Sequence, residues 1–207
     1  MVVGGLKSTN LGIACLLADN YAARTTHVLS PLKVTRLNSL DVGISVPTHA
    51  PDKVDSVVIL NCEGAGEIQV DTNRLLQPEY PSDTLRAFDG ELHGKLRYGP
   101  GKKSNDYVMN WTSAKDSVTW PVRLNEPATY DVSINYVAEK KSAGGAFTVN
   151  FGSQTLSGMV KPGDPQIVAL GRVSLKPGTF KIGVAATKIF GGELMRLRSL
   201  ELKTAAE

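Results

Sequence analysis

Apolar and polar residues alternate with a period of two over several short stretches of the chain. The clearest stretches are residues 40–46, 118–124, 130–136, 147–151 and 180–184. Successive side chains of a β-strand point to opposite faces, so each stretch predicts a strand with one face on a core. Proline and glycine turns separate the stretches, and no long segment has helical periodicity. We therefore expect an all-β protein of antiparallel sandwich type with very little helix.

The N-terminal third has a different pattern. Residues 11–18 and 56–60 are continuous apolar runs, which are typical of strands buried on both faces. The composition then becomes polar and rich in proline, and we interpret residues 71–85 as a linker. The predicted organisation is two antiparallel β-sandwich units, 1–70 and 86–207. The first is small for an independent sandwich, so we expect it to dock onto the second unit or to be the tail of a larger domain.

Composition and charge narrow the class of protein. Hydrophobic residues make up 42% of the 207 residues and charged residues 21%, which is ordinary for a globular protein. The net charge of +3 comes without a basic stripe, so we expect no nucleic-acid partner. No apolar run approaches the ~20 residues that a membrane span needs, so we expect no membrane span.

Only two cysteines are present, Cys15 and Cys62, and both lie in apolar stretches. Two buried free thiols and a disulfide between them are both compatible with the sequence.

No motif for catalysis stands out. The three histidines lie in no nucleophile elbow, no zinc-type spacing occurs, and no glycine-rich phosphate loop opens a helix. None of the 20 carboxylates can be chosen over the others as a glycosidase pair. We therefore predict no catalytic residue in this chain, although a small hydrolase remains an alternative.

Aromatic residues are few but gather between residues 98 and 120. Trp120 is in phase with the alternation of its strand, which predicts a core position. Residues 91–116 combine aromatic rings with Asn, Asp, Arg and Lys side chains, a composition suited to stacking on sugar rings and bonding their hydroxyls. The residues predicted to contact carbohydrate are Trp111, Tyr107, Tyr98, Asn105 and Asp116. The alternative is a long polar loop with a buried tryptophan anchor.

Two sets of segments resemble known families. Residues 41–60 (DVGISVPTHAPDKVDSVVIL) resemble the closing strands of the C-terminal β-domain of family 29 α-L-fucosidases, and residues 16–19 with 32–34 are similar to the strand pair before them. Residues 110–111, 116–122, 126–132 and 191–202 are similar to a carbohydrate-binding-module-like β-sandwich. Such sandwiches are appended to bacterial fucosidases and sulfatases.

The resemblance implies a partial fucosidase-type β-domain over 1–70 and a jelly-roll, carbohydrate-binding-module-like sandwich over 86–207. It also implies a parent retaining glycosidase whose catalytic barrel lies upstream of residue 1, so that barrel or partner domain and a glycan, for instance a fucosylated one, are the expected partners. The expected location is periplasmic or secreted. Sandwiches of this type often hold a structural calcium, for which Glu91 matches one ligand, while the last strand lacks the expected aspartate.

The competing hypothesis belongs to a different class of function. A structural or interaction β-sandwich module with no sugar site would pair its apolar N-terminal strands with another chain.

Overall fold

The computed structural model describes residues 2–3, 10–17, 28–38, 41–49, 57–63, 71–100 and 106–205. The chain divides into two compact units, Met1–Asp71 and Thr72–Glu207. Regular structure in the described residues consists of strands and two short 3₁₀ turns, η1 (Ala87–Asp89) and η3 (Lys140–Ser142), with no α-helix. The predicted all-β class with very little helix is therefore confirmed. No helix in the described part of the chain is long and apolar enough to cross a membrane.

The described strands of the first unit form two three-stranded antiparallel sheets. One sheet has the order β1 (Val2–Val3), β5 (Val42–Ile44), β4 (Val34–Arg36), and the other has the order β3 (Val28–Pro31), β2 (Asn10–Leu17), β6 (Val57–Glu63). The strands β2 and β6 coincide with the two continuous apolar runs of the sequence, as predicted.

The register between β2 and β6 decides between the two alternatives for the cysteines. Cys15 lies opposite Val58, whereas Cys62 lies opposite Leu11. Four residues of strand therefore separate the two cysteine positions, about 13 Å along the sheet at ~3.3 Å per residue. A disulfide requires Cα atoms within about 7 Å, so the backbone register of β2 and β6 is not that of a disulfide-bonded pair.

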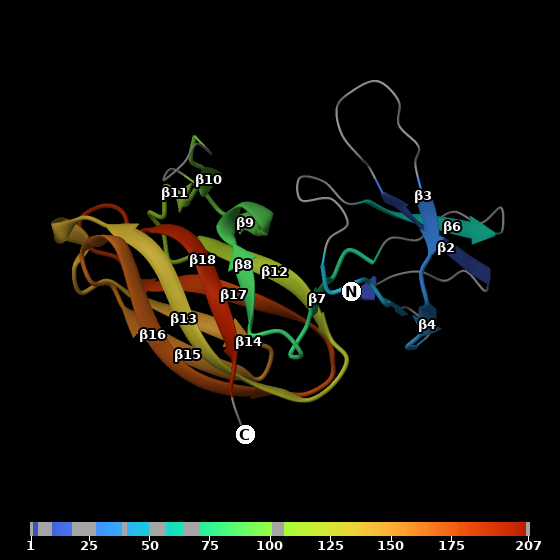
Figure 1. The fold of residues 1–207 in the computed structure, drawn as a ribbon. Coiled ribbons are helices and arrows are strands. Elements are labelled where there is room, and N and C mark those ends of the chain that lie inside the picture. Colours follow the sequence, from blue (N-terminus) through green and yellow to red (C-terminus); the bar gives the residue numbers. More distant parts are fainter. Residues whose placement is uncertain are drawn as a thin grey trace. The chain divides into compact units, whose positions relative to one another are not determined.

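The second unit consists of two larger sheets, which Figure 1 shows as two layers of strands. The first, here called the β18 sheet, has the order β10 (Arg97–Tyr98), β11 (Val108–Met109), β18 (Arg196–Thr204), β13 (Ala128–Ala138), β16 (Gly163–Leu175), with β8 (Ser82–Arg86) also paired to β18. The second, the β12 sheet, has the order β15 (Gln154–Met159), β14 (Ala146–Phe151), β17 (Gly178–Lys188), β12 (Ser117–Leu124), β7 (Arg74–Leu76), with β9 (Glu91–His93) also paired to β12. All pairs are antiparallel except β7 with β12.

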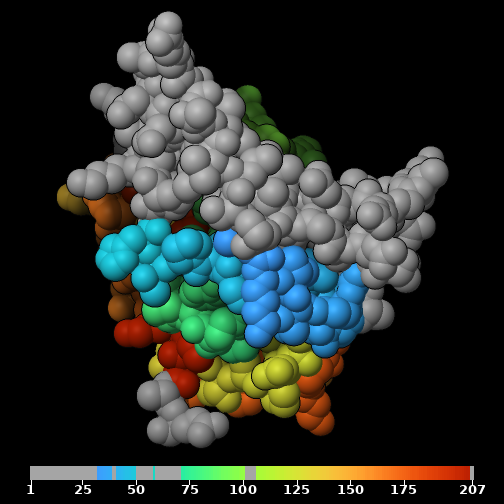
Figure 2. Space-filling model, turned by 45° about the vertical axis from the view of Figure 1, so that its right-hand side comes forward, coloured from blue at the N-terminus to red at the C-terminus, as the bar shows by residue number. Residues whose placement is uncertain are grey.

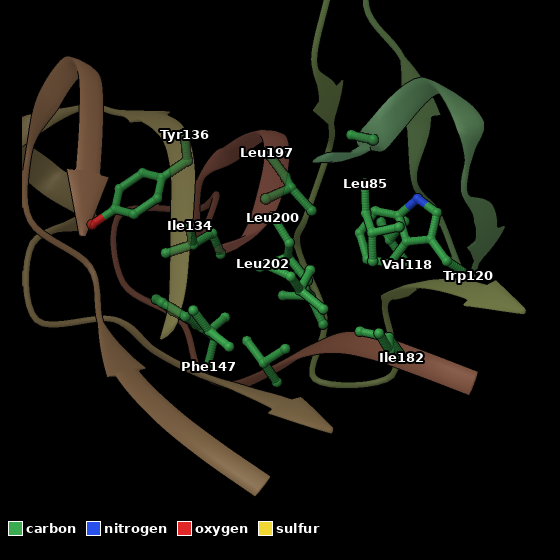
Figure 3. Close-up of a cluster of buried hydrophobic side chains, with 14 of the residues drawn as sticks. Leu85, Val118, Trp120, Ile134, Tyr136, Phe147, Ile182, Leu197, Leu200 and Leu202 are labelled. Atoms are coloured by element: carbon green, nitrogen blue, oxygen red, sulfur yellow. The ribbon is translucent and has the colours of Figure 1, made fainter. Parts of the chain in front are cut away.

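The predicted period of two places the core between these sheets. Val118, Trp120, Val122 and Leu124 alternate along β12 and are all buried. They belong to one hydrophobic cluster with side chains of the β18 sheet, and Figure 3 shows Ile134, Leu197, Leu200 and Leu202 in that interior. Trp120 has the predicted core position, and its indole Nε1 donates a hydrogen bond to the Arg86 carbonyl at 2.9 Å.

The interpretation of residues 71–85 as a linker is wrong. This segment supplies β7, which pairs with β12, and most of β8, which pairs with β18 along its whole length. Leu76 and Leu85 are fully buried in the hydrophobic cluster. In Figure 2 the green atoms of this segment lie against yellow and red atoms of later strands. The proline-rich turn that suggested a linker is the connection between two strands of the sandwich.

One core residue carries a polar group without a partner. The Tyr130 hydroxyl is buried, has no hydrogen-bond partner in the described structure, and its burial raises the Tyr130 pKa far above the usual range. Because an unsatisfied buried hydroxyl is costly, Tyr130→Phe should raise the free energy of unfolding by about 1 kcal/mol in urea denaturation.

Tyr136→Phe is the matched control for that variant. The Tyr136 hydroxyl is also enclosed but accepts a hydrogen bond from the Lys161 backbone N–H at 2.9 Å. Its removal should lower the free energy of unfolding by about 1 kcal/mol. Equal destabilisation by both substitutions would show that the Tyr130 hydroxyl does have a stabilising partner.

Candidate functional site

Five connections between strands gather at one end of the second unit, here called the loop end. The register shows this, because Ala138 lies opposite Gly163, Val137 opposite Arg196, and Ala146 opposite both Met159 and Lys188. The connections are residues 94–96, 110–116, 139–145, 160–162 and 189–195. The short strands β10 and β11 extend the β18 sheet on this side. Four of the predicted sugar-contact residues lie in or beside the loop end, and Asn105 lies outside the described residues.

Trp111 does not face a ligand. Its side chain is completely buried in the hydrophobic cluster, and its indole Nε1 donates to the Asp116 carbonyl at 3.0 Å. Its own carbonyl accepts a hydrogen bond from the Leu194 N–H at 2.9 Å, which ties loop 110–116 to loop 189–195. The prediction of a sugar contact is wrong for Trp111, and the alternative of a buried tryptophan anchor describes it correctly.

Asp116 is likewise a structural residue rather than a ligand contact. It is 1% exposed, and its carboxylate accepts three backbone hydrogen bonds, from Lys95 at 2.9 Å, Thr112 at 2.9 Å and Ser113 at 2.7 Å. These bonds close the turn after Trp111 and fasten it to loop 94–96. Gly94, with a φ of 83°, lies so close to this carboxylate that a side chain would collide with it. The Asp116 carboxylate is therefore not accessible to a sugar.

Tyr98 is the predicted residue that the structure leaves accessible. It is 46% exposed on β10, and its ring lies 5.1 Å from that of Phe88, centroid to centroid, at an interplanar angle of 34°. The Tyr98 hydroxyl donates to the Gly90 carbonyl at 2.9 Å. Phe88 is 36% exposed and belongs to η1. These two rings form the aromatic pair, an apolar surface open to solvent.

The backbone under the aromatic pair is held firmly. The carbonyl of Arg86 accepts the Trp120 indole N–H, and the Arg86 guanidinium donates to both carboxylate oxygens of Asp89 at 3.0 and 3.2 Å. Gly90 lies so close to Val118 and Trp120 that a Cβ atom would come within 2.6 Å of a Val118 methyl group. The two rings are therefore fixed before any ligand arrives, which lowers the entropic cost of binding.

Sequence reasoning missed Phe88. It precedes the polar stretch 91–116 that suggested the site, and it lies ten residues from Tyr98 in sequence. Only the turn η1 brings the two rings together. A phenylalanine in a turn of acidic and small residues, Ala87-Phe88-Asp89-Gly90, was the one available signal.

Tyr107 lies beside a network of charges at the start of β18. The Arg196 guanidinium lies 5.7 Å from the Tyr107 ring centroid, donates to Glu193 at 3.2 Å and lies 3.4 Å from Glu139. Lys141 pairs with Glu139 at 3.0 Å, and its hydrogen bond lowers the pKa of that carboxyl. The network encloses a shallow hollow of about 10 Å³, lined in part by Ser142, with room for one water molecule.

The same network holds an unusual backbone conformation. Asn110 is the one described non-glycine residue with a positive φ, 69°, and its N–H donates to Glu193 at 2.7 Å. Its side-chain amide donates to the Lys95 carbonyl at 2.6 Å. Left-handed conformations cost energy outside glycine, and these two hydrogen bonds offset that cost. The Tyr107 carbonyl accepts a hydrogen bond from the Gly99 N–H at 2.8 Å, next to Tyr98, while its ring lies beside Arg196.

Glu91 does not fit the predicted calcium ligand. Its carboxylate accepts hydrogen bonds from the Lys181 ammonium at 2.9 Å and the Thr119 hydroxyl at 3.3 Å, and the Lys181 bond lowers the Glu91 pKa. Calcium needs six to eight oxygen ligands, several of them carboxylates. No group of three or more His, Cys, Asp or Glu side chains in the described part of the chain could hold a metal ion. A cation at Glu91 would face a lysine instead of a second acid.

Comparison with solved structures places the fold among carbohydrate-binding modules and domains associated with glycoside hydrolases. A GH26-CBM35 β-(1,4)-mannanase of Podospora anserina matches 61% of this chain and 28% of its own, with 22% identity and a TM-score of 0.51. The CBM36-1 domain of a multidomain xylanase from the hindgut metagenome of Trinervitermes trinervoides matches over 61% of this chain and 99% of its own, with 12% identity and a TM-score of 0.51.

A third similar structure extends over both units. The functional form of the mosquito-larvicidal Cry4Aa toxin from Bacillus thuringiensis matches 97% of this chain and 43% of its own, with 12% identity and a TM-score of 0.53. This chain therefore spans less than half the length of the mannanase and of the toxin. At such identities the likeness shows the fold alone.

Comparison of the sequence itself gives a family. No curated protein matches the chain. A family model described as a domain of unknown function, DUF5077, matches residues 97–207, which is more than half of the chain and includes β10 to β18 with four of the five loop-end connections. The chain therefore belongs to the DUF5077 family.

Proposed function

We propose that the second unit is a non-catalytic carbohydrate-binding module whose ligand stacks on the aromatic pair of Phe88 and Tyr98. The observation that carries the proposal is the exposure of two rings, 36% and 46%, on a backbone fixed from below. The C–H faces of sugar rings stack on such surfaces, while nearby polar groups orient the hydroxyls. The likeness of the fold to CBM35- and CBM36-containing structures supports the same function.

The test compares two tyrosines of equal exposure. Tyr98 is 46% exposed in the aromatic pair, and Tyr80 is 45% exposed in the turn before β8, away from the loop end. A glycan array with the full chain identifies a ligand, and titration calorimetry then measures its dissociation constant for each variant. Tyr98→Ala should weaken binding by about tenfold, since a stacked ring contributes on the order of 1 kcal/mol beyond its buried area. Tyr80→Ala should leave binding unchanged.

The outcomes separate the two classes of function. Loss of binding with Tyr98→Ala and Phe88→Ala, together with intact melting temperatures, supports the module. Equal affinities for Tyr98→Ala and Tyr80→Ala place any bound glycan away from the aromatic pair. Absence of binding to every glycan on the array favours the structural or interaction module instead.

The wider context of the module is part of the same proposal. The parent protein is an α-L-fucosidase-like glycoside hydrolase, periplasmic or secreted, and the module holds its catalytic barrel near a glycan, for instance a fucosylated one. The support is the resemblance of residues 41–60 to the closing strands of the fucosidase C-terminal β-domain. Co-purification of the chain with a separately expressed fucosidase barrel tests this partnership, and turnover of an aryl α-L-fucoside by the chain alone would contradict the non-catalytic assignment.

A further inference from the structure

Positive charge is concentrated in the second unit. Residues 72–207 contain 18 lysines and arginines against 13 aspartates and glutamates, whereas the whole chain has 23 against 20. The small net charge of the chain is therefore the sum of a cationic second unit and a first unit of slight negative charge. The distribution of this excess within the module is the basis of the inference.

Carboxylates at the loop end already have hydrogen-bond or ion-pair partners. Glu139 and Glu193 are tied to Arg196 and Lys141, as described above. Asp106 and Asp164 both pair with Arg198, at 4.0 and 3.3 Å, from opposite sides of β18. Asp116 is buried under its three backbone N–H donors. Among the described residues of this end, these five carboxylates outnumber their three cationic partners by two, so they offset only part of the charge of the cations described next.

Six exposed cations of the loop end have no carboxylate partner in the described structure. They come from several connections and from the strand ends beside them: Lys95, Arg97, Lys115, Lys140, Lys161 and Lys188. Each is exposed, so its charge acts on solutes that approach this end of the sandwich. The excess of positive charge in the module is thus gathered around the loops instead of being spread over the sheets.

Aromatic surface lies among these cations. The Lys188 ammonium stands 4.7 Å from the centroid of the Phe190 ring, and Phe190 is 40% exposed on loop 189–195. Arg97 directly precedes Tyr98 of the aromatic pair on β10. The Lys188 ammonium and the Phe190 ring are therefore neighbours, whereas the side chains of Arg97 and Tyr98 project from opposite faces of β10. A ring beside a cation is the combination needed to hold a sugar ring and an anionic substituent at once.

We infer that the ligand of this module is an anionic glycan, whose carboxylate or sulfate groups meet the lysines and arginine of the loop end. This rests on the proposed carbohydrate-binding function and adds the chemical class of the ligand. Dispersed cations on separate loops suit substituents spaced along a flexible glycan better than the continuous phosphate row of a nucleic acid, for which a basic stripe is typical. A glycan is therefore the favoured polyanion.

The experiment uses charged and neutral forms of the same polymers. Binding of the full chain is measured to dextran sulfate against dextran, and to polygalacturonate against its methyl ester. The charged member of at least one pair should bind at least about tenfold more tightly, and raising sodium chloride from about 0.05 M to about 0.5 M should remove most of that preference. The two pairs distinguish sulfate from carboxylate as the recognised group.

Matched charge variants locate the effect. Lys161→Gln/Lys188→Gln removes two unpaired cations from the loop end, and Lys176→Gln/Lys203→Gln removes two exposed lysines near the opposite end of the sandwich. The first variant should lose about tenfold in affinity for the charged polymer, and the second should lose little. Equal losses would mean a general charge effect and would overturn the inference.

Two further outcomes separate the inference from the function on which it rests. Tight, salt-independent binding of neutral glycans, weakened by Tyr98→Ala, would retain the module and overturn the anionic ligand. A single-stranded oligonucleotide that binds more tightly than either charged polysaccharide would overturn the glycan assignment in favour of nucleic acid. Absence of binding to every polymer would remove both proposals together.

Discussion

Replacing Trp111 with alanine should lower the free energy of unfolding of the second unit by about 3–5 kcal/mol, the usual cost of removing a large buried aromatic side chain. Trp111 is 0% exposed and lies in the hydrophobic cluster of the module. Its truncation would also remove the indole hydrogen bond to the Asp116 carbonyl. Thermal and urea denaturation of the full chain measure the loss, and the transition of the second unit should move to much lower temperature.

Tyr98→Ala is the control for Trp111→Ala. Both substitutions remove an aromatic ring close to the same loops, but Tyr98 is half exposed at the edge of its sheet. The melting temperature should therefore change little with Tyr98→Ala while glycan binding falls. A sugar contact at Trp111, as the sequence predicts, would instead give a binding loss at nearly constant stability. That result for Trp111→Ala would show that its ring reaches a ligand and that the burial described above is wrong.

The two tryptophans, Trp120 and Trp111, show what the amino-acid pattern could predict and what it could not. Trp120 was predicted to be buried because it follows the alternation of Val118 and Val122 within one strand. Trp111 lies outside any strand, and its burial depends on contacts with loop 189–195, some eighty residues away. The period-two alternation predicts which side chains of a strand face the core. It does not predict which loops cover the end of a sandwich.

The segment 71–85 shows that local sequence patterns also fail to predict domain boundaries when the pairing is long-range. Its prolines and polar residues favour a linker locally. Its strands are short, β7 with three residues and β8 with five, and each is stabilised by pairing with a strand far along the sequence. Leu76 and Leu85 are the only large apolar anchors that bind it to the core among its described residues, and two isolated leucines give no periodic signal. Long-range pairing overrides local propensity here.

The candidate site residues also divide into those that a local pattern predicts and those that depend on long-range contacts. Composition alone identified a stretch of aromatic and polar residues, and Tyr98 is exposed as a ligand contact requires. Composition could not distinguish an aspartate that faces solvent from one that accepts backbone hydrogen bonds, because Asp and Asn serve both purposes in loops. Asp116 belongs to the second kind. Its role as a structural acceptor leads to the second of the two strongest predictions.

Asp116→Ala should lower the free energy of unfolding by about 3 kcal/mol. The substitution would leave three backbone N–H groups, those of Lys95, Thr112 and Ser113, without their acceptor in a part of the loop end that solvent reaches poorly. Hydrogen bonds to a charged group contribute roughly 1.5–3 kcal/mol each, and water can replace only part of them after truncation. Urea denaturation of the full chain measures the loss.

Two further variants make the result specific to the hydrogen bonds. Asp116→Asn keeps the volume of the side chain and one acceptor oxygen, but it turns an amide N–H₂ group toward one of the donors, so its stability should lie between those of the wild type and Asp116→Ala. Asp131→Ala removes an exposed carboxylate that pairs with Arg172 on the sheet surface, and it should change stability far less. If Asp116→Ala and Asp131→Ala were equally mild, water would replace the carboxylate as acceptor for these backbone donors, and the Trp111 anchor with the hydrogen bonds of Asn110 would be enough to hold loop 110–116.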